Sequence, residues 1–250
     1  MSSAPLWRQN RYDLAGRVAL VTGAFGGLGP ATTLALLESG ASVLAVASRE
    51  RPDALERLKA QAGEDGERLS AAVADARDEN AVAALVSDLV QRAGRLDILV
   101  NIIGGYAAGQ PVTALDTQTL DRMLELNLKT TFLFSKHAAR AMERNQFGRI
   151  INIASRAAVS GRKNAAAYAI AKASVITLTE AQSEEVVERG ITVNALLPGI
   201  IDTPANRASM PNANFARWPR PEEIARVIAF LASDDAGLIS GASIPVYGRS

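Results

Sequence analysis

Short apolar runs rich in β-branched residues alternate along the chain with longer segments in which apolar residues recur every three or four positions. The short runs are typical of buried strands, and the longer segments are typical of amphipathic helices. We predict strands near Val18–Thr22, Ser42–Ala47, Leu69–Ala74, Ile98–Asn101, Arg149–Ile153, Thr192–Leu197 and Ala242–Val246. We predict helices near Gly27–Ser39, Pro52–Ala62, Glu79–Ala93, Thr117–Arg144, Ala165–Arg189 and Pro221–Ala232.

The alternation of strands and helices predicts one α/β domain with a doubly wound, Rossmann-type fold. Its seven-stranded, mainly parallel sheet should carry helices on both faces. We assign residues 13–250 to this domain and residues 1–12 to a short N-terminal arm. The proline-rich segment 199–219 is interpreted as a substrate loop. Pro245 cannot donate to a strand ladder, so the last strand should lie at a sheet edge.

Composition narrows the possible chemistry. The 250 residues include 27 Lys and Arg, 26 Asp and Glu, one His and no Cys. The absence of Cys excludes disulfides and thiolate ligands, and a single His excludes a histidine-rich metal site, so we expect no metal. The nearly balanced charge argues against nucleic acid as a partner, and no segment reaches the ~20 apolar residues that span a bilayer. We therefore expect a cytoplasmic protein that does not act on a membrane.

A glycine-rich turn follows the first predicted strand and opens the first predicted helix. Small residues let a backbone approach a pyrophosphate, and the N-terminus of a helix supplies unpaired N–H groups. This context favours a dinucleotide-binding turn, whereas the glycines alone would also suit an ordinary tight turn. The candidate residues are Thr22, Gly23, Phe25, Gly27, Leu28 and Gly29.

Tyr168 and Lys172 are four residues apart in a predicted helix, so their side chains should share one helix face. A phenol with an ordinary pKa of ~10 is a poor acid–base catalyst at neutral pH. An ammonium about 4 Å away is worth up to ~4 kcal/mol at an effective dielectric near 20, so Lys172 is expected to lower the pKa of Tyr168. Ser155 lies thirteen residues upstream of Tyr168. The structural alternatives are a core tyrosine, a solvated lysine and a turn serine.

Together these motifs resemble those of the short-chain dehydrogenase/reductase family over essentially the whole chain. The family pattern Thr-Gly-x-x-x-Gly-x-Gly is matched at residues 22–29, and its Tyr-x-x-x-Lys at Tyr168 and Lys172. The family's catalytic serine falls on Ser155 and its helix asparagine on Asn127. Asparagine is a poor residue inside a helix, so Asn127 favours a functional kink, and the structural alternative is a simple helix irregularity. The resemblance implies hydride transfer between NAD(P) and a carbonyl or alcohol substrate.

The resemblance also implies a role for each catalytic residue. Tyr168 would be the general acid in carbonyl reduction and the general base in the reverse direction. Ser155 would hydrogen-bond the substrate oxygen, and Lys172 would lower the pKa of Tyr168 and hold the nicotinamide ribose. Asn127 would position a water molecule that relays protons to Lys172.

Cofactor choice in this family depends on the residues after the second strand, where members that prefer NAD usually place an aspartate. Here Ser48 removes that carboxylate and Arg49 can pair with a 2′-phosphate, so we expect NADP(H) to be favoured over NAD(H). The alternative is that Arg49 is simply exposed at the start of a helix. The other cofactor positions that the resemblance implies are Asp75, Ala76, Asn101, Gly104, Tyr168, Lys172, Pro198, Gly199, Ile201 and Thr203.

Two segments depart from the family pattern. The usual Asn-Asn-Ala-Gly appears as Asn101-Ile102-Ile103-Gly104, without the second asparagine. The usual Asp-Gly-Gly ending is replaced by Val246-Tyr247-Gly248-Arg249. The first departure bears on the hydrogen bonding of the sheet and on cofactor contacts.

Three activities are compatible with these features. A ketone reductase of the 3-oxoacyl-carrier-protein type fits the complete set of Ser155, Tyr168 and Lys172 best. A dihydropteridine-reductase-like enzyme is a second candidate, because residues 202–218 are locally similar to the loop of those enzymes. A non-catalytic NAD(P)-sensing protein could use the same fold. The resemblance further implies a homotetramer with contacts through the two long helices near 117–144 and 165–189 and the C-terminal strand.

Overall fold

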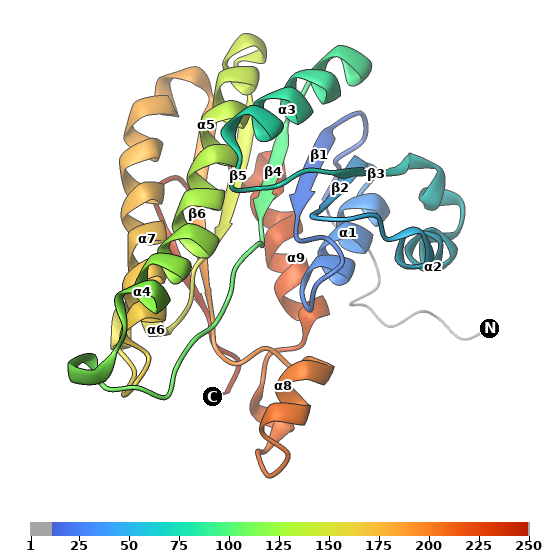
Figure 1. Ribbon diagram of the computed structural model, residues 1–250. Helices are drawn as coiled ribbons and strands as arrows, with labels where there is room; N and C mark the ends of the chain where they lie inside the picture. The colour runs from blue at the N-terminus through green and yellow to red at the C-terminus, as the bar shows by residue number, and fades with distance from the viewer. Residues whose placement is uncertain (1–11, 250) are drawn as a thin grey trace.

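The computed structural model describes residues 12–249 and shows a seven-stranded sheet (Figure 1). The predicted N-terminal arm, residues 1–12, lies outside the described residues except for Tyr12. The strands are β1 (Val18–Thr22), β2 (Ser42–Ala47), β3 (Leu69–Val73), β4 (Ile98–Asn101), β5 (Gly148–Ile153), β6 (Ile191–Pro198) and β7 (Ser243–Val246). Each predicted strand lies within one residue of the observed bounds.

Helices and helical turns connect these strands. The helices are α1 (Gly29–Glu38), α2 (Pro52–Ala62), α3 (Glu79–Ala93), α4 (Thr117–Leu124), α5 (Thr130–Met142), α6 (Ala157–Ser160), α7 (Ala166–Val186), α8 (Pro204–Ser209) and α9 (Pro221–Ala232). Pro52 and Pro221 occupy the first turns of α2 and α9, where a missing N–H has little cost. The shorter turns are 3-10 helices at Gly63–Arg68, Val112–Ala114, Glu143–Asn145, Val187–Arg189, Phe215–Arg217 and Asp234–Ala236, and a π-helix at Glu125–Lys129.

The strand order is β3-β2-β1-β4-β5-β6-β7, and all six neighbouring pairs are parallel. The sheet is thus fully parallel, and the chain reverses its direction of winding between β1 and β4. Thr22 is level with Asn101, and Asn101 is level with Asn152, so β1, β4 and β5 end at one edge. β7 lies at the outside of the sheet, which confirms the position predicted from Pro245.

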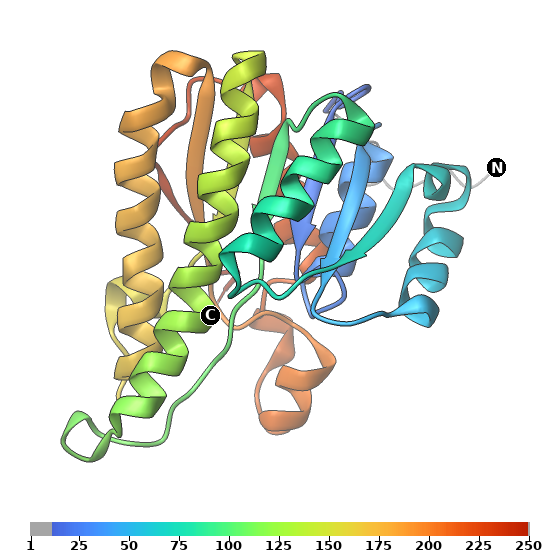
Figure 2. The same ribbon diagram turned by 45° about the horizontal axis from the view of Figure 1, so that its top comes forward.

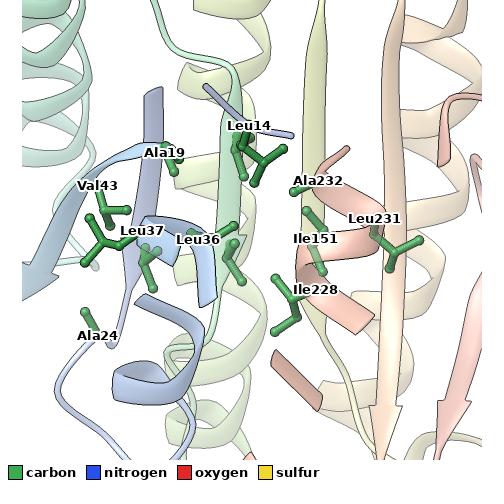
Figure 3. Packing of buried hydrophobic residues seen from close by; sticks show 14 of the residues in the cluster. Leu14, Ala19, Ala24, Leu36, Leu37, Val43, Ile151, Ile228, Leu231 and Ala232 are labelled. Carbon is green, nitrogen blue, oxygen red and sulfur yellow. The ribbon is translucent and has the colours of Figure 1, made fainter. Parts of the chain in front are cut away.

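Helices cover both faces of the sheet, so the central strands are apolar on both sides. On one face, Leu36 and Leu37 of α1 and Ile228 of α9 pack against the sheet (Figure 3). On the other face, α3, α5 and α7 lie side by side (Figure 2), and Phe134 of α5 is fully buried there. Within β1, Leu20 belongs to this second cluster, while its two neighbours belong to the first. Successive side chains of a strand therefore point to opposite helix-covered faces of the sheet. The site lies beyond these faces, at the ends of the strands.

Two predicted elements differ from the structure. The helix predicted over 117–144 is interrupted by the π-helix Glu125–Lys129, and Asn127 lies within this irregularity. The predicted substrate loop, 199–219, contains the short helix α8. Thr203 begins α8 by accepting a hydrogen bond from Asn206 N at 3.2 Å, and a proline follows at the first helical position. These start signals were present in the sequence, but the surrounding prolines and asparagines favoured a loop.

Candidate active site

The candidate catalytic residues meet at the carboxyl edge of the sheet, close to the switch between β1 and β4. In Figure 1 this is the end from which the segment after β4 and the segment leading to α8 leave the sheet. Asn127 comes from the π-helix, Ser155 from the segment after β5, and Tyr168 and Lys172 from α7. Elements distant in sequence therefore build one site.

Ser155 is held by the backbone on both sides. Ala154 N donates to Leu196 O at 2.8 Å, and Arg156 N donates to Pro198 O at 2.9 Å, so both neighbours of Ser155 are bonded to β6. The Ser155 hydroxyl oxygen accepts a hydrogen bond at 3.2 Å from the amide that opens α6. Its O–H proton can still be donated, because a hydroxyl both donates and accepts.

Tyr168 is partly buried, and this burial raises the pKa of its phenol above the ordinary value of 10.0. A hydrogen bond with Ser155 acts in the opposite direction, and Tyr106 has a smaller raising effect on the same pKa. The expected lowering of this pKa by Lys172 is therefore wrong for this structure. The phenol is protonated at neutral pH, which is the state that a general acid requires.

Lys172 is buried, with 5% of its surface exposed, and its Nζ donates to the carbonyl oxygen of Ile153 at 2.7 Å. This partner lies at the end of β5, so the ammonium is directed toward the sheet. Burial lowers the pKa of Lys172 from 10.5 to about 8. The charged form still predominates at pH 7 and is lost as the pH rises through about 8.

The side chain of Asn127 anchors the segment that follows β4. Its Oδ1 accepts from Gly105 N at 3.2 Å, and its Nδ2 donates to Gly105 O at 3.1 Å. The same Nδ2 donates to Met123 O at 2.9 Å, so both amide protons are used. The π-helix thus has a visible function, because it carries the asparagine that fixes a loop at the site.

Gly104 separates two of the candidate catalytic groups. A Cβ at this position would lie 2.6 Å from Asn127 Oδ1 and 3.1 Å from Lys172 Nζ. Both distances are shorter than an ordinary van der Waals contact, and Asn127 is fixed by its pairing with Gly105. Only glycine therefore fits here without displacing one of these side chains.

The glycine-rich turn contacts two other segments of the site. A Cβ on Gly27 would lie 2.8 Å from Thr203 Cγ2, and a Cβ on Gly23 would lie 3.1 Å from Ile103 N. A Cβ on Gly29 would overlap the backbone of the turn itself. The N-cap residue of α1, Leu28, makes no side-chain cap hydrogen bond, so the first-turn N–H groups other than at Pro30, which has none, can bind an anion. These features fit the pyrophosphate of a dinucleotide.

Thr22 joins β1 to the segment in which the family's second asparagine is missing. Its Oγ1 accepts from Ile102 N at 3.0 Å and from Ile103 N at 3.4 Å. The side chain of Asn101 turns into the core, where its Nδ2 donates to Asn152 Oδ1 at 2.9 Å and to a serine of α5 at 3.0 Å. Any cofactor contact by Asn101 would therefore have to come from its backbone.

The predicted adenosine-binding positions lie at the ends of β2 and β3. Ser48 and Arg49 are exposed, and Arg49 makes no hydrogen bond or ion pair with another described residue. Asp75 forms an ion pair with Arg77 at 3.0 Å, and this hydrogen bond lowers the pKa of Asp75. Ala76 beside it is buried. The remaining predicted positions lie in the glycine-rich turn or between the end of β6 and α8: Phe25, Leu28, Pro198, Gly199, Ile201 and Thr203.

Sequence reasoning missed Tyr106. Its ring centroid lies 4.9 Å from that of Tyr168, with the two planes at 75°, and 61% of Tyr106 is exposed. The residue follows Gly104 and Gly105 in a segment without helix or strand periodicity. The sequence feature that could have indicated Tyr106 is an aromatic residue directly after two glycines at the end of a strand.

The unusual C-terminal residues connect two segments around the site. The guanidinium of Arg156, next to Ser155, lies 5.0 Å from the centroid of the Tyr247 ring. Arg249 N donates to Arg217 O at 2.9 Å, and Arg217 Nε donates back to Arg249 O at 2.9 Å. Through these contacts, Tyr247 and Arg249 join the segment around Ser155 to the predicted substrate loop.

Comparison with known proteins identifies this architecture. A sequence model described as short chain dehydrogenase matches residues 17–214. The chain belongs to the short-chain dehydrogenase/reductase family. Enzymes of this family bind NAD(P), and the relatives of this chain are named as dehydrogenases or reductases. This short-chain dehydrogenase/reductase is accordingly an NAD(P)-dependent oxidoreductase.

Two curated relatives illustrate the range of the family. The chain is 38% identical over 242 residues to cis-4-hydroxycyclohexanecarboxylate dehydrogenase of Sinomonas cyclohexanicum. The alignment covers 94% of this chain and 96% of the relative. It is also 38% identical over 247 residues to the 3-oxoacyl-(acyl-carrier-protein) reductase FabG of Pseudomonas aeruginosa. That alignment covers 94% of this chain and 98% of the relative. The similarity spans almost the whole length of each protein.

Solved structures support the same assignment. A short-chain dehydrogenase/reductase from Mycobacterium ulcerans has a TM-score of 0.88 and 29% identity, covering 95% of this chain and 90% of its own. ElxO with NADP bound has a TM-score of 0.86 and 27% identity, and the match covers 93% of this chain and 97% of ElxO. A xylitol dehydrogenase bound to NAD+ has a TM-score of 0.85 and 31% identity, covering 94% and 98%.

Residues 12–249 contain neither a candidate membrane span nor a candidate metal cluster. None of their helices combines the length and the apolar character that crossing a membrane requires. Nor do these residues bring three or more His, Cys, Asp or Glu side chains together as a metal site would require.

Proposed function

We propose that this oxidoreductase reduces a ketone to a secondary alcohol, or catalyses the reverse reaction, with Tyr168 as general acid and base. The observation that carries the proposal is the meeting of Ser155, Tyr168 and Lys172 at one edge of the sheet. Ser155 hydrogen-bonds to Tyr168, and Lys172 lies one turn further along the same helix. A protonated phenol beside a hydroxyl suits a carbonyl oxygen that must be polarised and then protonated.

In reduction, the substrate oxygen would accept hydrogen bonds from the hydroxyl groups of Ser155 and Tyr168. The bound nicotinamide supplies the hydride that forms the new C–H bond. The carbonyl π electrons then reside on the oxygen, which takes the proton of Tyr168 and leaves a phenolate. The phenolate must then be reprotonated, because burial raises the pKa of Tyr168 and so disfavours its charged form. We further propose that protons return from water by way of Asn127 and Lys172.

The cofactor preference is proposed to be NADP(H) over NAD(H). Ser48 offers no carboxylate to repel a 2′-phosphate, and Arg49 is exposed without an ionic partner among the described residues. A guanidinium binds phosphate through two parallel hydrogen bonds, which suits this position. Lys172 would hold the nicotinamide ribose, and the N-terminus of α1 would hold the pyrophosphate.

The proposed substrate is a small ketone or the corresponding alcohol. In support, the named relatives include a dehydrogenase of a hydroxylated cyclohexane ring and reductases of 3-oxoacyl thioesters. Each of those names describes interconversion of a carbonyl and a secondary alcohol. The dihydropteridine-reductase-like activity remains an alternative that depends on the local likeness of segment 202–218.

The proposed assembly is a cytoplasmic homotetramer. In support, a groove of about 810 Å³ runs along α4, the π-helix and α5, and it is lined by Gln118, Asp121, Arg122, Leu124, Glu125, Leu128, Lys129 and Phe132. Phe132 is 44% exposed, and Ile170 on α7 is 48% exposed. A second copy of this chain could bury both. Light scattering after size-exclusion chromatography tests the assembly, and Phe132→Asp should lower the measured mass.

The decisive experiment follows oxidation of NADPH and NADH with ketones, 3-oxoacyl thioesters, sugars, quinones and quinonoid dihydropterin. We expect turnover with ketones or 3-oxoacyl thioesters, and a loss of kcat of at least ~100-fold in Tyr168→Phe with cofactor binding retained. Near-normal turnover of Tyr168→Phe would refute the role of the phenol. Cofactor binding without turnover of any substrate class would instead support the NAD(P)-sensing alternative.

A further inference from the structure

We propose that Tyr106 is a substrate-binding residue and that its exposed ring selects ketones, or secondary alcohols, that carry a hydrocarbon ring. The inference rests on the proposed reductase function and narrows its substrate class. No sequence motif includes Tyr106, so the sequence analysis assigned it no role at this site.

The position of Tyr106 follows from its contact with Tyr168. The two ring centroids are 4.9 Å apart in an edge-on arrangement, but only Tyr106 is largely exposed, at 61%. A substrate whose oxygen reaches the hydroxyl of Tyr168 must therefore lie beside Tyr106. Aromatic rings favour neighbours at centroid distances of about 4.5–7 Å, so a substrate ring can use the free surface of Tyr106.

The backbone around Tyr106 is fixed from several directions. Gly105 is bonded in both directions to the side chain of Asn127. Three residues further along, Gly109 N donates to Asn164 O at 2.8 Å. Ala107 packs in the apolar cluster that includes Tyr168, Met123, Ala167 and Ala171. The ring of Tyr106 is therefore presented by a segment held at both ends, which limits the entropy lost when a substrate binds.

The segment that carries Tyr106 favours a hydrocarbon substrate body. Residues 102–115 include no charged side chain. Val112 in this segment is 72% exposed, and Val159 in α6 is 58% exposed. These residues belong to the two segments that the bond between Gly109 and Asn164 joins. Exposed apolar residues around a site are typical of surfaces that a ligand covers.

The test compares ketones with equal numbers of carbon atoms. Cyclohexanone is paired with 2-hexanone, and acetophenone with 2-octanone, using wild type, Tyr106→Leu, Tyr106→Phe and Gln110→Ala. Gln110 is exposed in the same segment and serves as the matched control. We expect wild type to prefer the ring ketones, and Tyr106→Leu to lower their kcat/KM about tenfold, mainly through KM. That factor corresponds to about 1.4 kcal/mol. Losses with the open-chain ketones should stay below about threefold, and Tyr106→Phe and Gln110→Ala should remain within about threefold of wild type.

The possible results separate this inference from the proposed function. Equal losses with ring and open-chain ketones would assign Tyr106 a structural role and overturn the inference. A wild-type preference for open-chain ketones, or turnover with another carbonyl class alone, would overturn it while the reductase function stands. The absence of turnover with every carbonyl substrate would overturn both.

Discussion

Lys172 donates a hydrogen bond from its Nζ to the carbonyl oxygen of Ile153 at 2.7 Å, in a buried position. Burial lowers its pKa from 10.5 to about 8. Between these two values the unfolded chain binds this proton more tightly than the folded chain does. The contribution of Lys172 to the free energy of unfolding therefore rises with pH across this interval.

Lys172→Met isolates this effect, because it removes the titrating group and keeps an unbranched side chain. We expect the free energy of unfolding of wild type to rise by about 2–3 kcal/mol relative to the variant between about pH 7 and pH 10. Urea unfolding of both proteins at pH values across this interval measures the difference, and groups that both proteins share cancel. A difference that is constant with pH would contradict the lowered pKa.

Gly104→Ala should damage catalysis more than folding. Its Cβ would lie 2.6 Å from Asn127 Oδ1 and 3.1 Å from Lys172 Nζ, so one of these groups must move. We expect kcat to fall at least about tenfold, since small displacements of catalytic groups have large effects on rate. Ketone reduction and a thermal melt measure the two properties. The control is Ala108→Ser, an exposed change in the same segment, and normal kcat in Gly104→Ala would refute the steric argument.

Most of the fold was predictable because local patterns determine its elements. The apolar strand Val18–Thr22 and the glycine-rich turn that follows it are visible in a few consecutive residues. Asn127 indicated that the helix is irregular at this position, because asparagine is unfavourable inside a regular helix, but it did not indicate a π-helix. Helix α8 was missed although Thr203 and Pro204 gave a start signal, because the helix is short and lies among turn-forming residues.

The relative positions of site residues could be predicted only where the residues lie close together in the sequence of one element. Tyr168 and Lys172 share α7, as their spacing requires. The partner of Lys172, Ile153, lies on a strand, and the burial that shifts both pKa values depends on the packing of distant segments. Tyr106 reaches Tyr168 because the segment after β4 is bonded next to the start of α7, where Gly109 N donates to Asn164 O, and no local pattern indicates this contact.

Arg49→Ala should weaken binding of NADPH more than binding of NADH. Arg49 is exposed and has no ionic partner among the described residues, so its proposed partner is the 2′-phosphate. A hydrogen bond to a charged group contributes about 1.5–3 kcal/mol, so we expect Kd for NADPH to rise at least about tenfold. Titration of cofactor fluorescence measures both Kd values, with the exposed Arg57→Ala of α2 as control. An equal rise for NADPH and NADH would refute phosphate recognition by Arg49.

Asn152→Ala should destabilise the protein through a buried polar network. Asn152 is fully buried, accepts from Asn101 Nδ2 at 2.9 Å and donates to Thr179 Oγ1 at 2.9 Å. Its removal leaves buried partner groups with fewer hydrogen bonds, so we expect a loss of about 2–4 kcal/mol in the free energy of unfolding. Urea denaturation measures this loss, and Asn80→Ala on the exposed start of α3 should change stability by less than about 0.5 kcal/mol. A loss below about 1 kcal/mol in Asn152→Ala would contradict this expectation and would show that the bond from Asn101 to Ser135 of α5, together with the β4–β5 ladder, is sufficient to hold Asn101.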